Sequence, residues 1–146
     1  MPISLRDRRK NQYDIKGKRI LEVHEKYFLG DVGLRHSVLS YKAADVPGVL
    51  ENLVFLELMR RNYTVYIGKI SDKEIDFIAE KENKKIYIQV AYLLASEEKI
   101  EQEFNPLQQV KDNYPKYVVT MDTIMGSGVD GIEWMNIIDF LLSDKY

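Results

Sequence analysis

The chain has 146 residues, of which 45% are hydrophobic and 30% are charged, a size and composition typical of one globular domain with its own core. Its formal net charge of −2 excludes a general attraction to polyanions, so any contact with nucleic acid would depend on a local basic patch. The absence of cysteine excludes disulfide bonds and cysteine-ligated zinc. The two histidines are too few for a histidine-based metal cluster.

No apolar run approaches the roughly 20 residues of a membrane span, and the N-terminal residues lack the apolar core of a signal peptide, so we expect a cytoplasmic protein without a membrane contact.

The first residues predict a segment distinct from the body of the domain. Residues 1–20 are rich in charge and poor in large aliphatic side chains. They predict an extended or partly disordered basic arm ahead of one domain over residues 21–146. This arm would act either as a linker or as a nucleic-acid contact.

The clearest helix signal covers residues 48–62, GVLENLVFLELMRRN, in which aliphatic side chains recur at helical spacing without an internal breaker. Pro47 and Gly48 suit its start, and Asn62 suits its end. Three short segments rich in β-branched and aromatic residues follow at 63–70, 74–80 and 84–94. Their tight connections predict an antiparallel meander.

The remaining elements complete an α/β pattern. Residues 96–114 predict a second helix, with Ser96 as its N-cap and Pro106 as a point where it would bend or split. Residues 116–122 and 131–137 then read as strands, and residues 136–144 as a closing helix. The order of helix, three strands, helix, two strands and helix predicts an α+β sandwich with a mixed sheet flanked by helices.

The candidate chemistry lies where the second and third strands of the meander meet. Phosphodiester hydrolysis with magnesium needs carboxylates on rigid elements and a group that stabilises charge or orients water. Asp76 could supply one carboxylate, and Glu51 or Glu57 of the preceding helix could supply another. The positions for a further acid and a lysine hold Gln89 and Ala91. Gln89 carries no charge, and Ala91 offers no cation.

Each of these residues also has a structural interpretation. Glu51 and Glu57 could lie on the solvated stripe of an amphipathic helix, and Gln89 could be a buried amide with satisfied hydrogen bonds. If a metal binds, its ligands are expected to be Asp76, Glu51 and Gln89, with Mg²⁺ or Mn²⁺ as the ion. Arg60 and Arg61 could contact phosphate, or they could complement the dipole of the helix that they end.

Several blocks of the sequence resemble one known family. They are GVLENLVFLELMRRNYTVYIGK, KEIDFIAE, KIYIQVAYLLASEEKIEQEFNPLQQVKDNYPKYVVTMD and GIEWMNIIDFLL, together with KYFLGDVGLR near the start. The blocks resemble the uncharacterised C-terminal domain of a large bacterial and archaeal family of AAA-type ATP-binding proteins. That resemblance implies a restriction-endonuclease-like domain of the PD-(D/E)xK type, which follows an ATPase domain that this chain lacks.

Carried over residue by residue, the resemblance places the nuclease-like acid on Asp76, the helical acids on Glu51 and Glu57, and the usual Glu-x-Lys on Gln89-Val90-Ala91. The last substitution removes two groups on which cleavage depends. We therefore expect no working catalytic residue in this domain and a vestigial site made by Glu51, Glu57, Asp76 and Gln89.

Three hypotheses follow from this pattern. In the first, the domain is non-catalytic and acts as a regulatory or interaction module of an ATP-binding protein, with ATP bound in the missing domain. In the second, it is a metal-dependent DNA nuclease with an incomplete site. In the third, it binds DNA without cleavage, through Arg60, Arg61 and the basic arm. The ATPase domain of the parent chain is the expected partner, DNA is an alternative partner, and an open sheet edge would support a homo-oligomer.

Overall fold

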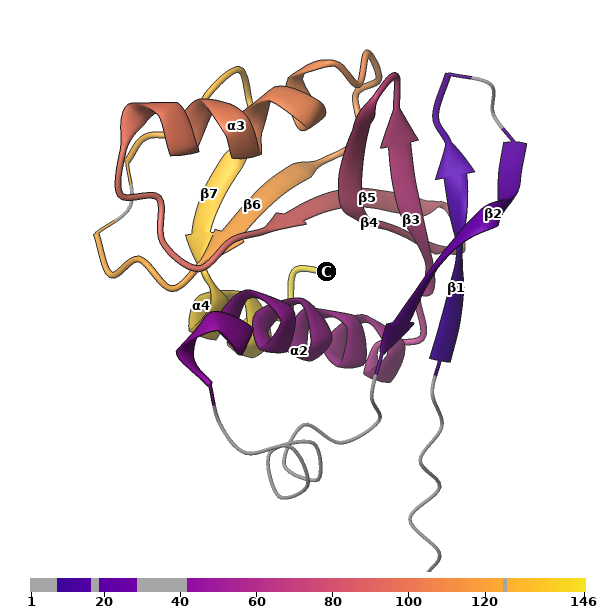
Figure 1. Cartoon of the computed structure of the whole chain (residues 1–146), viewed down its shortest axis with the longest axis horizontal. Coiled ribbons are helices and arrows are strands. Elements are labelled where there is room, and N and C mark those ends of the chain that lie inside the picture. Colours follow the sequence, from indigo (N-terminus) through magenta and orange to yellow (C-terminus); the bar gives the residue numbers. More distant parts are fainter. Residues whose placement is uncertain (1–7, 17–18, 29–41, 125) are drawn as a thin grey trace, which may run out of the picture.

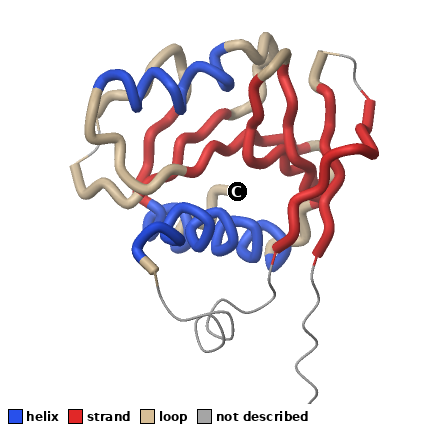
Figure 2. The backbone as a smooth tube through the Cα atoms, in the orientation of Figure 1, coloured by secondary structure: helices blue, strands red, loops and turns tan. Residues whose placement is uncertain are grey.

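The computed structural model describes residues 8–16, 19–28, 42–124 and 126–146. Within these residues a seven-stranded mixed sheet forms the middle layer of the molecule. Helix α3 covers one face of this sheet, and helices α2 and α4 cover the other (Figures 1 and 2). The structure is therefore the α+β arrangement that the sequence predicts, with a mixed sheet flanked by helices.

The order of strands across the sheet is β2-β1-β3-β4-β5-β6-β7. The central strands β3, β4 and β5 pair antiparallel, as predicted from their short connections. Strand β6 pairs parallel with β5, and β7 pairs parallel with β6. The strands span Arg8–Asp14 (β1), Arg19–Phe28 (β2), Thr64–Ile70 (β3), Lys73–Lys81 (β4), Lys84–Val90 (β5), Lys116–Thr120 (β6) and Glu133–Asn136 (β7).

Helix α2, Val46–Arg60, confirms the strongest helix signal and begins slightly earlier than expected. Pro47 lies in its first turn, where the missing backbone N–H costs no hydrogen bond. A short 3₁₀ turn over Ala43–Asp45 precedes it. Asn62 follows with φ of 63°, the left-handed conformation that ends many helices and that asparagine tolerates.

Helix α3, Glu97–Gln108, begins as predicted, because the Ser96 hydroxyl accepts a hydrogen bond from the Lys99 backbone N–H. One expectation about this segment was wrong, because the helix stops at Gln108 rather than near Tyr114. Of the two effects expected of Pro106, a split does not occur, since the helix runs through this residue as one element. Helix α4, Ile137–Leu142, is capped by the side chain of Asn136, which accepts from the Ile138 N–H.

The N-terminal segment differs most from the sequence prediction. Residues 8–14 form β1, which pairs antiparallel with β2 and parallel with β3, so half of the expected arm is part of the sheet. The Ile15 backbone N–H also donates to the Lys69 carbonyl oxygen at 2.8 Å. A boundary at residue 20 therefore does not separate an arm from the sheet. Residues 1–7, the remainder of the tract at 17–18, and residues 29–41 lie outside the described part of the chain.

Two apolar cores lie on the two sides of the sheet. One contains Phe55 and Leu58 of α2 with Phe77 and Ile88 of the strands and Phe140 of α4. The other packs side chains of α3 onto the opposite face, and includes Phe104, Leu107, Ile78, Tyr87 and Val118. Neighbouring residues such as Tyr87 and Ile88 thus serve opposite cores, as expected from the alternation of side chains along a strand. Both faces of the central strands are consequently buried.

Among the described helices, none combines the length and the hydropathy that crossing a bilayer requires.

Candidate functional site

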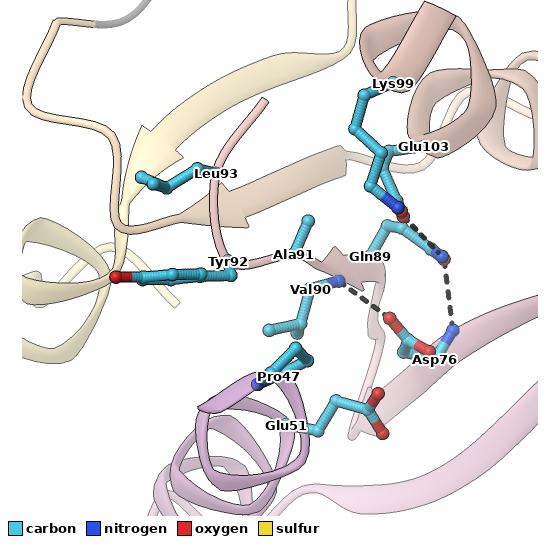
Figure 3. A pocket seen from close by; sticks show the side chains of 10 residues that line it. All are labelled: Pro47, Glu51, Asp76, Gln89, Val90, Ala91, Tyr92, Leu93, Lys99 and Glu103. Atoms are coloured by element: carbon cyan, nitrogen blue, oxygen red, sulfur yellow. Dashed lines mark hydrogen bonds and ion pairs between the residues drawn. The ribbon is translucent and has the colours of Figure 1, made fainter. Parts of the chain in front are cut away.

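A cavity of about 290 Å³ lies at the C-terminal end of β5. Strand β4 contributes Asp76, the neighbouring strand β5 contributes Gln89 from its last two residues, and helix α2 supplies Glu51 (Figure 3). The first two turns of α3 contribute Lys99 and Glu103. Its other lining residues are Pro47, Val90, Ala91, Tyr92 and Leu93.

The register of the β4–β5 hairpin brings Asp76 and Gln89 together. Phe77 pairs with Ile88 across the antiparallel ladder, so the next positions outward are Asp76 and Gln89. The exposed turn that joins the two strands consists of Glu82 and Asn83, and Glu82 has φ of 53°. A two-residue turn fixes the register of the strands that follow it. The sequence prediction that these two residues belong to one site is consistent with this geometry.

Asp76 is buried, with 6% of its surface exposed. Its Oδ2 accepts a hydrogen bond from the Val90 backbone N–H at 2.8 Å. The Asp76 backbone N–H donates in turn to Gln89 Oε1 at 3.3 Å. One carboxylate oxygen of Asp76 therefore accepts a backbone hydrogen bond at the end of the β4–β5 ladder. This role is structural and involves no catalysis.

Gln89 links Asp76 to helix α3. Its Nε2 donates to Glu103 Oε2 at 3.1 Å, and Glu103 Oε1 forms an ion pair with Lys99 Nζ at 2.7 Å (Figure 3). The amide thus accepts on one side and donates on the other, which a carboxylate at the same position could not do. A continuous polar chain runs from Lys99 through Glu103 and Gln89 to the backbone of Asp76.

Lys99 and Glu103 of α3 join the cavity in addition to the residues predicted from the sequence. Their spacing of four residues places them on one face of α3, and the Ser96 cap fixes where that helix begins. The segment from Ala91 to Ser96 is short enough to return the start of α3 to the end of β5. The i, i+4 spacing of Lys99 and Glu103, so soon after Gln89, is a sequence signal for this part of the site. To recognise it, one must know how the chain runs from β5 to α3.

The donor set does not fit a divalent cation as it stands. Within the described ranges, no three side chains of His, Cys, Asp or Glu are grouped so that they could hold a metal ion. Glu51 extends from α2 toward Asp76 (Figure 3), but the Gln89 carbonyl oxygen already accepts from the Asp76 backbone. The cavity contains three carboxylates and the single ammonium group of Lys99. Cation binding would require these side chains to rearrange.

Comparison with known proteins supplies the family. The model of DUF4143, a domain of unknown function, matches residues 48–133. The chain belongs to this family. The matched DUF4143 segment runs from the first turn of α2 to the start of β7 and contains all the polar residues of the cavity. Strands β1 and β2 and helix α4 lie outside it.

A relative from Haemophilus influenzae, described as an uncharacterized protein, is 43% identical over 131 residues, which are 90% of this chain and 32% of that protein. The chain therefore spans about a third of the length of this curated relative. No solved structure matches the chain.

The other predicted site residues lie away from this cavity, at the far end of α2. The Glu57 carboxylate accepts hydrogen bonds from Arg60 Nε at 2.8 Å and from Arg61 Nε at 2.6 Å. Hydrogen bonds from Arg60, supported by Arg61, lower the pKa of Glu57 to about 2 against the cost of burial. Glu57 therefore stabilises the end of the first DUF4143 helix, and the structure does not bring it to Asp76.

The two arginines have different environments. The Arg60 side chain is 69% exposed, whereas that of Arg61 is 9% exposed. Arg61 Nη2 donates to the backbone oxygens of Phe140 at 3.3 Å and Leu141 at 3.2 Å, in α4. Its guanidinium group also lies over the rings of Phe140 and Tyr146. Arg61 thus ties α4 to the DUF4143 segment and is not presented to an external phosphate.

We expect Glu57→Gln to lower stability at neutral pH by about 2 kcal/mol, because hydrogen bonds to a charged group are lost. The pKa of Glu57 falls from 4.5 to about 2 on folding, so its contribution is fully present above pH 4.5 and disappears as the pH falls through 2. Urea unfolding at pH 7, 4 and 2.5 would show the gap between variant and wild type closing. Glu101→Gln, an exposed acid of α3, is the control and should show no such pH-dependent gap.

Proposed function

We propose that this DUF4143 domain is a non-catalytic, nuclease-like domain of the PD-(D/E)xK type that acts as a regulatory or interaction module at the C-terminal end of a longer ATP-binding protein. The frame of such a site is supported by Asp76 on one strand, Gln89 at the end of the next and Glu51 on the preceding helix. The proposal assigns no catalytic step to these residues.

The hydrogen bonds of Gln89 carry the proposal. This amide occupies the place of a metal-binding acid and is engaged on both sides, by the Asp76 N–H and by Glu103. A carboxylate at position 89 would repel the Glu103 carboxylate, whereas the Gln89 amide donates a hydrogen bond to it. Ala91, two residues later, is 4% exposed and supplies no cation. The local structure is thus built around a neutral side chain.

A longer parent protein is supported by the relative from Haemophilus influenzae, of which the aligned region makes up 32%. The resemblance of the sequence blocks to the C-terminal domains of AAA-type proteins supports an ATPase domain as the rest of such a chain. In that arrangement ATP binds outside this domain, and the ATPase domain is the partner of the module.

A metal-dependent DNA nuclease is the second candidate, and one observation favours it. Lys99 lies in the cavity with Asp76 and Glu51, although it comes from α3 rather than from the position of Ala91. A lysine at the site could stabilise the charge that develops on a phosphate during cleavage. Here, however, its ammonium group is paired with Glu103 at 2.7 Å.

The test is incubation of the purified domain with linear and supercoiled DNA in Mg²⁺ or Mn²⁺. We expect no cleavage above that of the Asp76→Ala variant prepared in parallel. Manganese-dependent cleavage that is lost in Asp76→Ala and again in Lys99→Ala would overturn the proposal and establish the second candidate. The exposed Lys111→Ala variant controls for loss of charge alone.

A further inference from the structure

A second cavity, of about 310 Å³, lies at the N-terminal end of β5, opposite the site described above. Seven residues of strand separate the two ends, a length of roughly 20 Å. The walls come from the residue before β3, the β4–β5 turn, the loop before β6 and the C-terminal segment. Four tyrosines and three lysines line it: Tyr63, Tyr114, Tyr117, Tyr146, Lys84, Lys85 and Lys145.

The lysines make this cavity a site for an anion. Its described lining contains no aspartate or glutamate. Lys84 and Lys145 are exposed, whereas Lys85 forms an ion pair with Glu80 at 2.9 Å. The acids Glu80 and Glu82 line an adjoining hollow, which shares Lys84, Lys85 and Tyr114 with the cavity. Two exposed ammonium groups at one mouth favour a phosphate or carboxylate group there.

The tyrosines supply flat apolar surface beside these charges. Tyr114 is 45% exposed, and Lys85 Nζ lies 5.4 Å from the centre of its ring. The rings of Tyr117 and Tyr146 meet edge to face, with centroids 5.0 Å apart, which holds both rings in place. An aromatic ligand can stack on the exposed Tyr114 ring while its anionic group meets the lysines.

Tyr63 adds a polar group in the wall of the cavity. The residue is 2% exposed, and its hydroxyl is buried without a hydrogen-bond partner among the residues that the structure describes. Such a group costs free energy that a ligand with a polar atom could recover. Burial raises the pKa of the Tyr63 phenol above 10.0, so the hydroxyl remains protonated and able to donate. Because it is covered in the free protein, ligand entry must move the side chains around it.

We propose that this cavity binds a nucleotide unit, with the phosphate on Lys84 and Lys145, the base on Tyr114, and a polar atom of the ligand on the Tyr63 hydroxyl. Its volume lies at the small end of ligand pockets, which hold about 300–1,000 Å³, so it suits one nucleotide. The unit is either a free mononucleotide or the end of a single strand. This inference stands independently of the function proposed for the site at the other end of β5.

The experiment is titration of the ¹⁵N-labelled domain with 5′-AMP, adenosine, inorganic phosphate and a 5′-phosphorylated ten-nucleotide single strand. We expect 5′-AMP to shift resonances at the N-terminal end of β5 and to bind at least tenfold more tightly than adenosine or phosphate. Lys84→Ala combined with Lys145→Ala should weaken binding more than tenfold, and Tyr114→Ala about fivefold. Lys111→Ala, which removes an exposed lysine elsewhere, should leave the affinity unchanged.

Tyr63→Phe separates binding from folding, because it removes only the hydroxyl. We expect this variant to be at least as heat-stable as the wild type and to bind 5′-AMP about fivefold more weakly, the effect of one lost hydrogen bond. Tighter binding of the oligonucleotide supports a strand end, and tighter binding of 5′-AMP supports a free nucleotide. Absence of shifts at this end of β5, equal affinity for phosphate and 5′-AMP, or unchanged affinity in Tyr63→Phe would overturn the proposal.

Discussion

Arg61→Ala is expected to lower the free energy of unfolding by about 3 kcal/mol, because it removes one partner of a part-buried ion pair together with two hydrogen bonds to α4. The Arg61 guanidinium group donates hydrogen bonds to the Glu57 carboxylate at 2.6 Å and to the backbone oxygens of Phe140 and Leu141. Its loss leaves these acceptors without that donor and removes the contact with the Tyr146 ring. Thermal unfolding should show a melting temperature lower by about 10 °C.

Arg60→Ala is the matched control, because Arg60 bonds the same Glu57 carboxylate but its side chain is 69% exposed. Its effect on stability should be small, since exposed ion pairs contribute little. Arg61→Lys should recover only part of the loss, because an ammonium group lacks the fork that reaches both carbonyl oxygens. Equal destabilisation by Arg60→Ala and Arg61→Ala would show that the contacts with α4 are unimportant.

Gln89→Glu is expected to have the second large effect, a loss of about 2 kcal/mol at neutral pH without metal. The substitution replaces the Nε2 donor, which lies 3.1 Å from Glu103 Oε2, by an oxygen that repels this carboxylate. Two carboxylates at this distance hold a proton more tightly than either alone, so the loss should shrink as the pH falls toward 5. Denaturant unfolding at pH 7 and pH 5 measures both quantities.

The same variant should gain affinity for Mn²⁺, because a further carboxylate joins Asp76 and Glu51. Millimolar Mn²⁺ is then expected to raise its melting temperature by several degrees and to leave that of the wild type unchanged. Gln89→Leu, which removes the hydrogen bonds without adding charge, is the control and should be destabilised at both pH values without a response to Mn²⁺. A melting temperature of Gln89→Glu that ignores Mn²⁺ would contradict the idea that Gln89 keeps the site from binding metal.

The sequence predicts the local part of this structure well. Asp76 and Gln89 lie in neighbouring strands joined by a two-residue turn, so pairing outward from that turn is enough to place them opposite each other. Ser96 marks the start of α3 through its own side chain. These features depend on residues close in the chain, where backbone preferences and hydrophobic periodicity are informative.

Features that depend on distant residues were not predicted. Residues 8–14 are highly charged, and their pairing with β3 depends on a parallel register more than 50 residues away. The inward orientation of Arg61 rather than Arg60 is set by acceptors in α4, 79 and 80 residues later. Lys99 reaches the cavity only because α3 packs on the end of the sheet. Single-sequence patterns do not contain these tertiary constraints.

Strand β5 has a consequence for how this domain can diverge. Its last two residues, Gln89 and Val90, line one cavity and its first residue, Lys84, lines another, and among the described residues the two cavities have no lining residue in common. Two connections each shape one cavity: the β5–α3 connection lines the cavity at the C-terminal end of β5, and the loop before β6 lines the cavity at its N-terminal end. The β4–β5 turn serves both, because it lines the second cavity and also sets the register of Asp76 and Gln89 in the first. Mutations in the β5–α3 connection or in the loop before β6 leave that register in place, so selection can remodel or discard the function of one end while the other is preserved.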